Sequence, residues 1–390
     1  MGRKTTIAAL IGNGMTIAYN PELTIPRITQ RIIERLDSAG DDDTQQAQLM
    51  RKVAERAGRT HAAADFEELV SPFDELRDTL PLIRKMATLA GDAGLRIDRS
   101  LRDSAEFAQL VYRHGVSHVL DVIAAESRAH EDAMNPIRNL LTSIVNTAQG
   151  GEVTFANLNY DALLMAGLCS NYENAMCDLA DGRGGQIEKM ISPDAVAHGR
   201  PLRTTANLPL SRHVTLIHLH GSLAWLREPR TGVVYRFNMA DVRDANFWTR
   251  WREGSTDWSP VVVLTNQTGK TNLIKKDPFK LAYEVFYQRL LTADKWLIAG
   301  TSLRDEGVNQ MLQLAWSRRT TCPQVLVVTR SSNPTERQIL DAIGWDPVWA
   351  GDPDPTKWLT ICRDGILEAP DTLDWAWWSA SGVVLRAYAS

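Results

Sequence analysis

The 390-residue sequence predicts an α/β fold with a doubly wound, mostly parallel sheet and a helical insertion between its first two strands. Three observations support this prediction. Short apolar runs of strand length recur along the chain, and helical patterns separate several of them. A stretch of about 100 residues after the first run has helical spacing throughout. Apolar strands that alternate with helices are typical of a parallel sheet covered on both faces.

The first strand is expected at Thr5–Ile11, an apolar run that ends at Gly12. Thr24 followed by Ile25 and Pro26 marks a helix start, because a hydroxyl cap with proline in the first turn favours initiation. Five further strands are expected at Val153–Asn157, Val214–His220, Val261–Leu264, Trp296–Ala299 and Val325–Thr329. Helical patterns lie at Asp161–Leu168, Pro278–Thr292, Glu306–Ser317 and Glu336–Ile343.

These elements divide the chain into three expected parts. The first is a discontinuous Rossmann-like domain, the second a helical insertion, and the third a C-terminal helix with an aromatic tail packed on the core. Their ranges are, in that order, 1–43 with 148–335, 44–147, and 336–390. Within the first part, residues 226–258 are expected to form a small excursion with a hairpin at Val233–Phe237.

Charge and composition argue against several classes of protein. The chain has 43 basic and 47 acidic residues, a net charge of -4, whereas proteins that coat nucleic acid carry a basic excess. No uncharged apolar run approaches the roughly 18 residues of a membrane span. The apolar stretch near the N-terminus is too short for a secretory signal. We therefore expect a cytoplasmic protein that binds neither membranes nor nucleic acid directly.

The cysteines predict no metal site. Four are widely spread along the chain, namely Cys169, Cys177, Cys322 and Cys362. No pair has the C-x-x-C spacing of a zinc site, and the count is too low for a disulfide scaffold. We expect reduced structural thiols and no bound zinc.

Two predicted strands end in glycine-rich segments that suit phosphate groups. Gly12-Asn13-Gly14 follows the first strand, where glycines let the backbone turn sharply and approach a pyrophosphate closely. The full dinucleotide fingerprint needs a third glycine at position 17, where Ile17 stands. Gly300-Thr301-Ser302 follows a later strand and offers hydroxyls to a phosphate or a ribose. An ordinary strand-ending turn remains an alternative for both segments.

Polar side chains also follow the second strand. Asn159 and Asp161 stand where an open parallel sheet binds its ligands, at the carboxyl end of a strand. Their amide and carboxylate groups can hold a ribose hydroxyl or a carboxamide. An Asx-turn that caps the helix beginning near Asp161 explains the same residues equally well.

Two histidines stand near the end of the third predicted strand. His218 and His220 share one face if the strand is regular, because side chains alternate along a strand. No carboxylate or cysteine at suitable spacing completes a metal site with them. His220 precedes Gly221 at the ligand edge, whereas His218 lies deeper. We therefore expect His218 to be a hydrogen-bonded core residue and His220 to carry the chemistry.

The order of these motifs resembles the sirtuin superfamily, and more particularly the bacterial sirtuin-like, NAD-consuming effectors of anti-phage defence. In that family a glycine-rich loop, an Asn-x-Asp segment, a His-Gly motif and a Gly-Thr-Ser strand end follow one another, as they do here from residue 5 to about residue 335. The most specific parts are Asn159-Tyr160-Asp161 and His220-Gly221-Ser222. Two departures stand out: the paired C-x-x-C motifs of deacylase sirtuins are missing, and Asn13 replaces the alanine of many sirtuins.

The resemblance implies a hydrolase, a NAD nucleosidase that cleaves NAD to nicotinamide and ADP-ribose. The bond breaks through an oxocarbenium-like state, and an imidazole near its ordinary pKa of about 6.5 suits the general base. His220 would be that base, Asn159 would orient the ribose or the water, and Asp161 would hold the carboxamide. The residues implied for the phosphates and the adenosine side are Gly12, Asn13, Gly14, Gly300, Thr301, Ser302 and Asn333.

Other functions remain open. If a protein nucleophile takes the place of water, the protein would be an NAD-dependent deacylase or ADP-ribosyltransferase. If it has no catalytic activity, it would be a scaffold that binds NAD or ADP-ribose. The resemblance also implies NAD depletion in abortive infection, with a separately encoded HerA-like hexameric ATPase as a partner. We expect a homo-oligomer whose contacts come from the helical insertion and from Trp375, Trp377 and Trp378, because clustered aromatic residues are enriched at interfaces.

Overall fold

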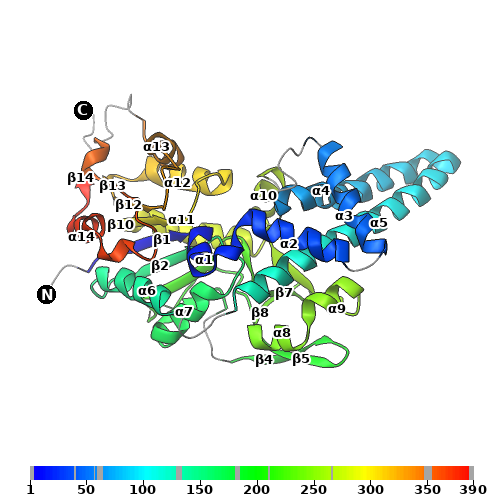
Figure 1. Cartoon of the computed structure of the whole chain (residues 1–390), viewed down its shortest axis with the longest axis horizontal. Helices are drawn as coiled ribbons and strands as arrows, with labels where there is room; N and C mark the ends of the chain where they lie inside the picture. The colour runs from blue at the N-terminus through cyan, green and yellow to red at the C-terminus, as the bar shows by residue number, and fades with distance from the viewer. Residues whose placement is uncertain are drawn as a thin grey trace.

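A large parallel sheet forms the body of the protein, shown in Figure 1. The computed structural model describes residues 4–38, 41–56, 58, 65–128, 134–180, 185–209, 211–264, 267–346 and 354–385. Seven strands lie in the order β13-β12-β10-β1-β2-β6-β3, and every neighbouring pair is parallel. Their bounds are β1 Ile7–Ile11, β2 Val153–Asn157, β3 Met176–Asp178, β6 Val214–His218, β10 Lys295–Ala299, β12 Gln324–Val328 and β13 Leu359–Cys362. The predicted fold class is confirmed.

The strands of this sheet are buried on both faces. Every residue of β1, β2, β6, β10 and β12 is buried, which explains why their sequences are continuous apolar runs rather than alternating ones. Along β1, Ala8 and Leu10 pack into one core, whereas Ile7, Ala9 and Ile11 pack into another. The two faces of β1 therefore pack against two different layers of helices.

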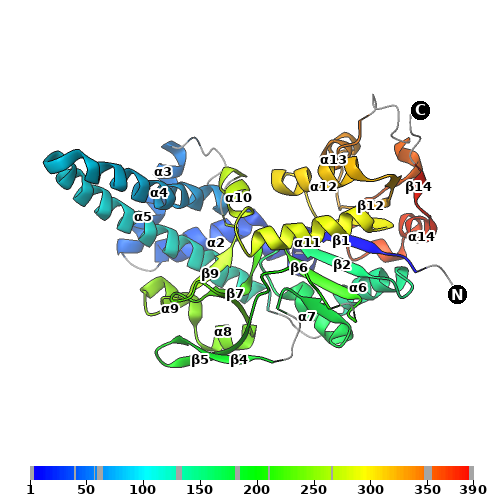
Figure 2. The ribbon, with the colours of Figure 1, turned by 180° about the vertical axis from the view of Figure 1, so that it is seen from behind.

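Helices cover both faces of the sheet, as the two opposite views show (Figures 1 and 2). One core includes residues of α1 Asn13–Tyr19, α6 Asn135–Thr147, α7 Leu163–Tyr172 and α14 Leu373–Ala380. The other includes residues of α11 Phe279–Thr292, α12 Glu306–Arg318 and α13 Glu336–Ile343. Smaller elements are α10 Gln267–Leu273, η4 Pro355–Lys357, η5 Ala369–Asp371, and the paired short strands β11 Thr321–Cys322 and β14 Val384–Leu385.

A second, five-stranded antiparallel sheet was not predicted. It has the order β4-β5-β8-β7-β9, and α8 Met239–Asp244 and α9 Phe247–Glu253 pack beside it. Its strands are β4 Ile187–Ser192, β5 Ala195–Pro201, β7 Gly221–Arg227, β8 Val234–Phe237 and β9 Ser259–Val262. The expected hairpin at Val233–Phe237 is the single strand β8, which pairs with β5 and β7. The expectation that Val261–Leu264 joins the parallel sheet is wrong, because a short apolar run does not specify its partner strand.

Four further α-helices lie between α1 and α6 in the described part of the chain. They are α2 Ile25–Ser38, α3 Asp41–Arg56, α4 Phe66–Ala87 and α5 Gly91–Glu126, and α4 and α5 form a long hairpin, joined by η2 Thr88–Ala90, that projects from the body (Figures 1 and 2). Their buried residues share one core with the small sheet and α9. The last helix of the expected insertion, α6, packs instead on the large sheet. The division of the chain into domains stays a prediction.

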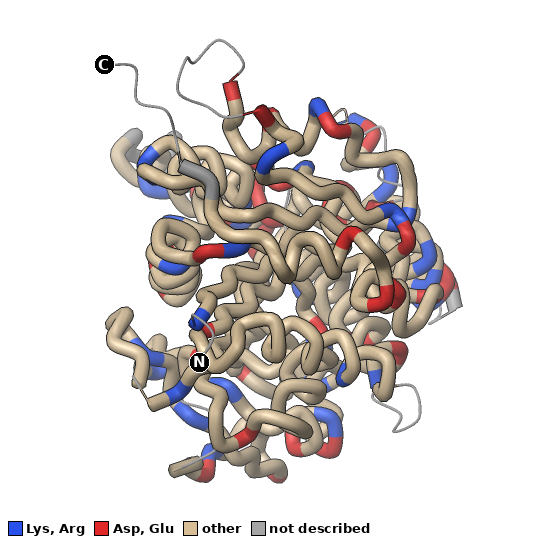
Figure 3. The backbone as a smooth tube through the Cα atoms, turned by 90° about the vertical axis from the view of Figure 1, so that its left-hand side faces the viewer, with Lys and Arg blue, Asp and Glu red and all other residues tan. Residues whose placement is uncertain are grey.

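The C-terminal part completes the large sheet. β13 adds its edge strand, and Trp375 and Trp378 of α14 are buried beside it, whereas Trp377 is 44% exposed. Basic and acidic residues are interspersed over the face that carries both chain ends (Figure 3), in keeping with their near balance in the sequence. Within the described ranges, no helix has both the length and the apolar character needed to cross a membrane.

Candidate active site

All four predicted motifs follow strands whose carboxyl ends meet at one edge of the large sheet. β1 is central, with β2 on one side and β10 on the other, so the chain leaves β1 in one direction and returns on the opposite side. Such a point of reversal opens a crevice outside the carboxyl ends, where doubly wound folds bind ligands. The topology therefore brings the glycine loop, the Asn-x-Asp segment, His220 and the Gly-Thr-Ser segment to one region.

The two glycine-rich segments pack directly on each other. The amide of Gly12 donates to the Ala299 carbonyl at 2.9 Å, and that of Gly14 donates to the Gly300 carbonyl at 2.7 Å. A Cβ on Gly14 would lie 2.5 Å from the Gly300 Cα. Gly300 has a φ of +66°, in the left-handed region that favours glycine. The glycines are thus required for close contact of two loops, whether or not a phosphate also binds there.

Asn159, Thr16 and Asp161 form a buried hydrogen-bond chain beneath the glycine loop. Asn159 Nδ2 donates to the Gly12 carbonyl at 3.1 Å and to Thr16 Oγ1 at 2.9 Å. Thr16 Oγ1 donates in turn to Asp161 Oδ2 at 2.5 Å. Both amide protons of Asn159 are therefore used within the protein, which fixes the amide orientation and leaves Oδ1 as its acceptor for other groups.

Asp161 is held at both carboxylate oxygens. Its Oδ1 accepts from the Leu163 amide at 2.9 Å, at the start of α7, while Oδ2 accepts from Thr16. Burial raises the pKa of Asp161 above its ordinary value, and the two hydrogen bonds partly oppose this effect. The carboxylate therefore positions Thr16 and, through it, Asn159. The contact with the Leu163 amide is the Asx-turn alternative, and the binding role of Asp161 stays a prediction.

His220 lies between β6 and β7, where the chain passes from the large sheet to the small one. Gly221 has a φ of +81°, and a Cβ there would lie 2.1 Å from the Val261 carbonyl oxygen, so only glycine fits beside β9. The His220 carbonyl accepts from the Val263 amide at 2.9 Å. The imidazole is buried, with Nε2 at 3.2 Å from Asp305 Oδ2 and 3.5 Å from Tyr283 Oη. β9 and α12 thus set the position of this side chain.

Asp305 connects His220 to a charged network. Lys270 Nζ lies 3.7 Å from Asp305 Oδ2 and 2.8 Å from Glu67 Oε2. Burial alone would raise the pKa of Asp305, but the neighbouring His220 imidazole and the Lys270 charge bring it well below its ordinary value. Burial lowers the pKa of Lys270, but the carboxylates of Glu67 and Asp305 raise it overall. Asp305 and Lys270 are therefore both charged at neutral pH.

Tyr160, between Asn159 and Asp161, continues the network on the other side of Glu67. Its hydroxyl lies 2.9 Å from Glu67 Oε1 and 2.7 Å from the Val263 carbonyl oxygen. Burial raises the pKa of Tyr160 well above its ordinary value, and it does the same for Tyr283 beside His220. Both phenols therefore remain protonated and act as hydrogen-bonding groups.

His218 lies deeper than His220 and belongs to the core. It is on β6, its Nδ1 lies 3.4 Å from Asn157 Nδ2, and its ring packs edge-on against Trp225 with centroids 5.6 Å apart. Burial lowers the pKa of His218 to about 3, so the ring is neutral at physiological pH. These contacts favour a structural role.

A cavity of about 100 Å³ opens at this sheet edge. One part of it is lined by α1, with Asn13 and Thr16, and by the loops after β2 and β6, with Asn159, Asp161 and His220. The helices after β1 line the remainder, with Leu23 of η1 Pro21–Leu23, Ile25 and Ile28 of α2, Phe66 and Glu67 of α4, and Ile123 of α5. The expected insertion is therefore part of the site.

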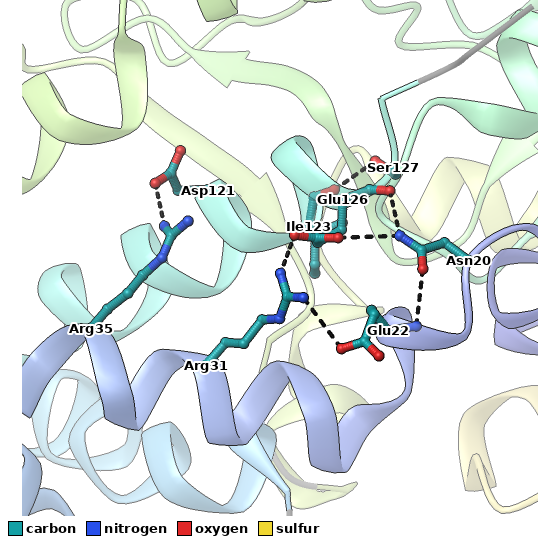
Figure 4. Close-up of polar contacts among 8 residues, drawn as sticks. All are labelled: Asn20, Glu22, Arg31, Arg35, Asp121, Ile123, Glu126 and Ser127. Atoms are coloured by element: carbon teal, nitrogen blue, oxygen red, sulfur yellow. Dashed lines mark hydrogen bonds and ion pairs between the residues drawn. The ribbon is translucent and has the colours of Figure 1, made fainter.

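Ion pairs join the two helices that form this wall (Figure 4). Arg31 of α2 contacts Glu126 of α5 and lies 3.2 Å from Glu22 of η1. One turn further along α2, Arg35 lies 2.5 Å from Asp121. Exposed pairs of this kind contribute little stability individually, but a set of them fixes the relative position of the helices. α2 and α5 are thus held together beside the cavity.

Gly12, Gly14 and Gly300 are not among the residues that line this cavity. Three further predicted binding residues, Thr301, Ser302 and Asn333, do not line it either. Thr301 is half-buried and its Oγ1 accepts from the Leu303 amide at 3.2 Å, which is the turn-and-cap alternative for that segment. Ser302 is exposed. Asn333 is exposed in the loop after β12, and its carbonyl accepts from Thr329 Oγ1 at 2.9 Å. Their assignment to the adenosine side stays a prediction.

Sequence reasoning missed five residues of the site: Thr16, Glu67, Lys270, Tyr283 and Asp305. For Asp305 a signal was present, because an aspartate before the predicted helix Glu306–Ser317 is a helix cap, and its Oδ1 indeed accepts from the Val308 amide at 3.0 Å. For Glu67 and Lys270 no local pattern distinguishes them from other charged residues on helices. Their contacts arise from packing between distant segments.

One group of possible metal ligands occurs within the described ranges. Cys362, Asp364 and Asp374 each offer an atom within 4.8 Å of the others, at the end of β13. Burial raises the pKa of the Cys362 thiol, which disfavours the thiolate that zinc requires. These residues therefore fit a zinc ion poorly, and the expected absence of zinc stays a prediction.

Comparisons with known proteins give a family match and a similar solved structure. A family model described as the SIR2-like domain matches residues 153–348, half of the chain. A solved structure titled "Structural Basis for the Mechanism and Regulation of Sir2 Enzymes" is similar over 94% of this chain and 91% of its own, with 10% identity and a TM-score of 0.36. No curated protein matches the chain. On the family match, the chain belongs to the SIR2-like family.

Proposed function

We propose that the protein is a NAD glycohydrolase that releases nicotinamide and leaves ADP-ribose. Membership of the SIR2-like family supports an NAD-dependent function. One observation carries the finer proposal: Asn159 and Asp161, which follow β2, line the same cavity as His220, which follows β6. Amide, carboxylate and imidazole groups in a small enclosed site suit a reaction that activates water or a ribose hydroxyl.

His220 acts as the general base in this proposal. Its Nε2, 3.2 Å from Asp305 Oδ2, keeps the proton that faces the carboxylate, so Nδ1 is the nitrogen that accepts a proton. The ionised Asp305 stabilises the imidazolium that forms, as the carboxylate of a catalytic triad does. Tyr283, at 3.5 Å, helps to hold the ring. Asp305 is thus a positioning residue for His220.

Asn159 orients the reacting hydroxyl or water. Both of its amide protons are used by Gly12 and Thr16, so Oδ1 accepts a hydrogen bond from that group. A fixed acceptor keeps the nucleophile close to its attack geometry, and such positioning contributes a large share of many rate enhancements. Asp161 keeps Thr16 in place and, as the resemblance implies, holds the carboxamide of nicotinamide.

The glycine loop and the Gly-Thr-Ser segment bind the rest of NAD in this proposal. As the resemblance implies, Gly12, Asn13 and Gly14 admit the pyrophosphate. The Gly12 and Gly14 amides already donate to Ala299 and Gly300, so Asn13 is the member of this loop that lines the cavity. Gly300, Thr301 and Ser302 hold the adenosine side, with Asn333 near its ribose.

The identity of the acceptor is tested by following every product of NAD. The protein is incubated with NAD, and nicotinamide, free ADP-ribose and protein-bound ADP-ribose are quantified. We expect equal amounts of nicotinamide and free ADP-ribose in reactions to which no acylated peptide is added. Release that requires an acetyl-lysine peptide would instead identify a deacylase, and ADP-ribose on protein a transferase. NAD binding without any release would identify a scaffold.

The biological role is a separate part of the proposal. The resemblance supports NAD depletion in anti-phage defence by abortive infection, with a homo-oligomer and a HerA-like hexameric ATPase as the assembly that controls it. Co-purification with such an ATPase, and loss of cellular NAD during infection only when His220 is intact, are the results that would support this role.

A further inference from the structure

A second cavity, of about 440 Å³, lies between the α4–α5 hairpin and the small sheet. The hairpin contributes Arg77, Tyr112 and Arg113, β7 contributes Arg227, and α9 contributes Trp251. None of these residues lines the smaller cavity that holds His220. The volume falls within the range of roughly 300–1,000 Å³ that is typical of small-molecule sites.

Positive charge predominates in this second cavity. Three of its lining residues are arginines, and only Asp257 among them is acidic. Arg77 is paired with Asp74, with Nη2 at 2.7 Å from Oδ1. Arg113 and Arg227 form no ion pair with any described residue, and the buried Nε of Arg113 has no hydrogen-bond partner there. Half-buried guanidinium groups without a paired carboxylate favour an anionic ligand.

Arg227 lies at the wall of this cavity without an ion pair to any described residue. Its Nη1 donates to the Gly232 carbonyl at 3.0 Å, which leaves its other donors for a ligand. Burial lowers the pKa of Arg227 below its ordinary value. An anion beside the Arg227 guanidinium would stabilise its positive charge.

Aromatic side chains form another part of the wall. The Arg77 guanidinium lies over the Tyr112 ring, 4.1 Å from its centroid, which fixes the ring in place. Trp251 is buried and also lines the cavity. Rigid aromatic rings beside cationic groups suit a ligand that combines a planar ring with a phosphate.

We propose that this second cavity binds a nucleoside monophosphate. Its phosphate contacts Arg113 and Arg227, whose guanidinium groups match phosphate oxygens in pairs of hydrogen bonds, and its base packs on Tyr112 and Trp251. The ligand is distinct from NAD at the sheet edge, because the two cavities share no lining residue.

Two elements connect this cavity to the candidate active site. α5 carries Tyr112 and Arg113 at the second cavity and Ile123 at the first, about 15 Å apart at 1.5 Å per residue. β9 and its extension carry Val262 at the second cavity, while the amide of the next residue, Val263, donates to the His220 carbonyl. A bound nucleotide therefore contacts the same helix and strand that position His220, and we assign it a regulatory role.

Binding is measured by titration calorimetry of the full chain with AMP, GMP and inorganic phosphate. We expect the Arg113→Gln, Arg227→Gln double variant to lose at least tenfold in affinity for AMP. Arg99→Gln, an exposed arginine on the same helix, is the matched control and should bind normally. Any AMP bound at the sheet edge is unaffected by these changes, so the difference between variants isolates the second cavity. The charge-retaining double variant, Arg113→Lys with Arg227→Lys, should keep an intermediate affinity.

Three results would overturn the binding proposal: no AMP or GMP binding at millimolar concentration, unchanged affinity in a folded double variant, or phosphate that binds as tightly as AMP. Tyr112→Leu sharpens the last point, because it should lower the affinity for AMP and leave that for phosphate unchanged.

The regulatory part rests on the proposed NAD hydrolysis. Saturating AMP should change the rate of nicotinamide release by about fivefold or more in the wild type and not in the double variant. Binding without any change in release would overturn regulation alone. Absence of release with and without AMP would count against the proposed function, while the measured binding would stand.

Discussion

The seven-stranded sheet and the α4–α5 hairpin bury their apolar residues to very different extents. Every residue of β1, β2, β6, β10 and β12 is buried, whereas the hairpin and its tip leave large apolar side chains exposed. We call these the hairpin apolar surface: Leu76, Leu82, Ile83, Met86, Leu89, Ile97, Phe107 and Leu110. Large exposed apolar side chains gathered in one segment are a candidate protein interaction surface. The sheet thus builds a site, and the hairpin presents a surface.

The two regions meet at the base of the hairpin. Asp65 caps α4 by accepting from the Glu67 amide at 2.9 Å, and Glu67 stands in the first turn, where a carboxylate is favourable. Glu67 then pairs with Lys270, and Phe66 and Ile123 line the cavity beside His220. The base of the hairpin therefore forms part of the candidate active site.

The largest expected effect is on the rate of nicotinamide release, for substitutions at the edge of the large sheet. His220→Ala should reduce nicotinamide release by about 10²- to 10⁴-fold without unfolding the protein, because it removes a general base. Asn159→Ala should be similarly damaging, and Asp305→Asn should lower the rate and shift its pH profile. His218→Ala is the control: it should lower the melting temperature through a lost hydrogen bond of roughly 1 kcal/mol and a small cavity, yet keep activity per folded molecule. Full activity in His220→Ala would exclude this mechanism.

The next largest expected effect is on the free energy of unfolding, for substitutions at the base of the hairpin, where the two regions meet. Glu67→Gln should destabilise the protein by about 3 kcal/mol, because it leaves the buried Lys270 charge without its closest partner. The double variant Glu67→Leu with Lys270→Met should recover part of this loss, since both charges are then absent. Chemical denaturation measures both. Equal stability of Glu67→Gln and the wild type would show that the hairpin base is not anchored by this pair.

Acid should destabilise both regions through one buried histidine in each. Burial lowers the pKa of His218, in the large sheet, and of His118, in α5, to about 3. The unfolded chain therefore binds more protons than the folded chain between pH 6.5 and pH 3, so the free energy of unfolding falls as the pH falls through this window. Each histidine contributes on the order of a few kcal/mol.

Neutral replacements separate the two contributions. His218→Asn and His118→Asn should each flatten the acid limb of a plot of unfolding free energy against pH, and the double variant should flatten it further. As the pH falls, we expect backbone amides to lose hydrogen-exchange protection first in the region whose histidine replacement flattens the acid limb more. An acid limb that keeps its slope in both variants would contradict burial as the cause.

The smallest effect on stability is expected at the hairpin apolar surface. Leu82→Ser and Met86→Ser should change the free energy of unfolding by less than about 0.5 kcal/mol, since both side chains are already exposed. The same variants should reduce the predicted homo-oligomer in light scattering. Leu69→Ser, a buried position on the same helix, is the control and should unfold the protein instead. A wild type that is monomeric at micromolar concentration would remove the basis for this prediction.

The sequence by itself determined the five central strands of the large sheet, β12, β10, β1, β2 and β6, and the order of motifs along its edge, whereas the edge strands β3 and β13 were not predicted. Strands buried on both faces must be continuous apolar runs, so they can be found locally. The carboxyl ends of parallel strands meet at one edge, so residues at strand ends come together whatever lies between them. That is why Gly12, Asn159 and His220 could be predicted as neighbours before any contact was known.

Only the tertiary structure decided which other residues complete the site. β9 looks like any other apolar run, yet it joins the small sheet beside Gly221 and supports His220. Glu67, Lys270 and Asp305 come from α4, α10 and the turn before α12, and nothing in their local sequence marks them as partners. Strand pairing and ion pairing between distant segments depend on how whole layers pack, and that information is spread over the chain rather than written at any one position.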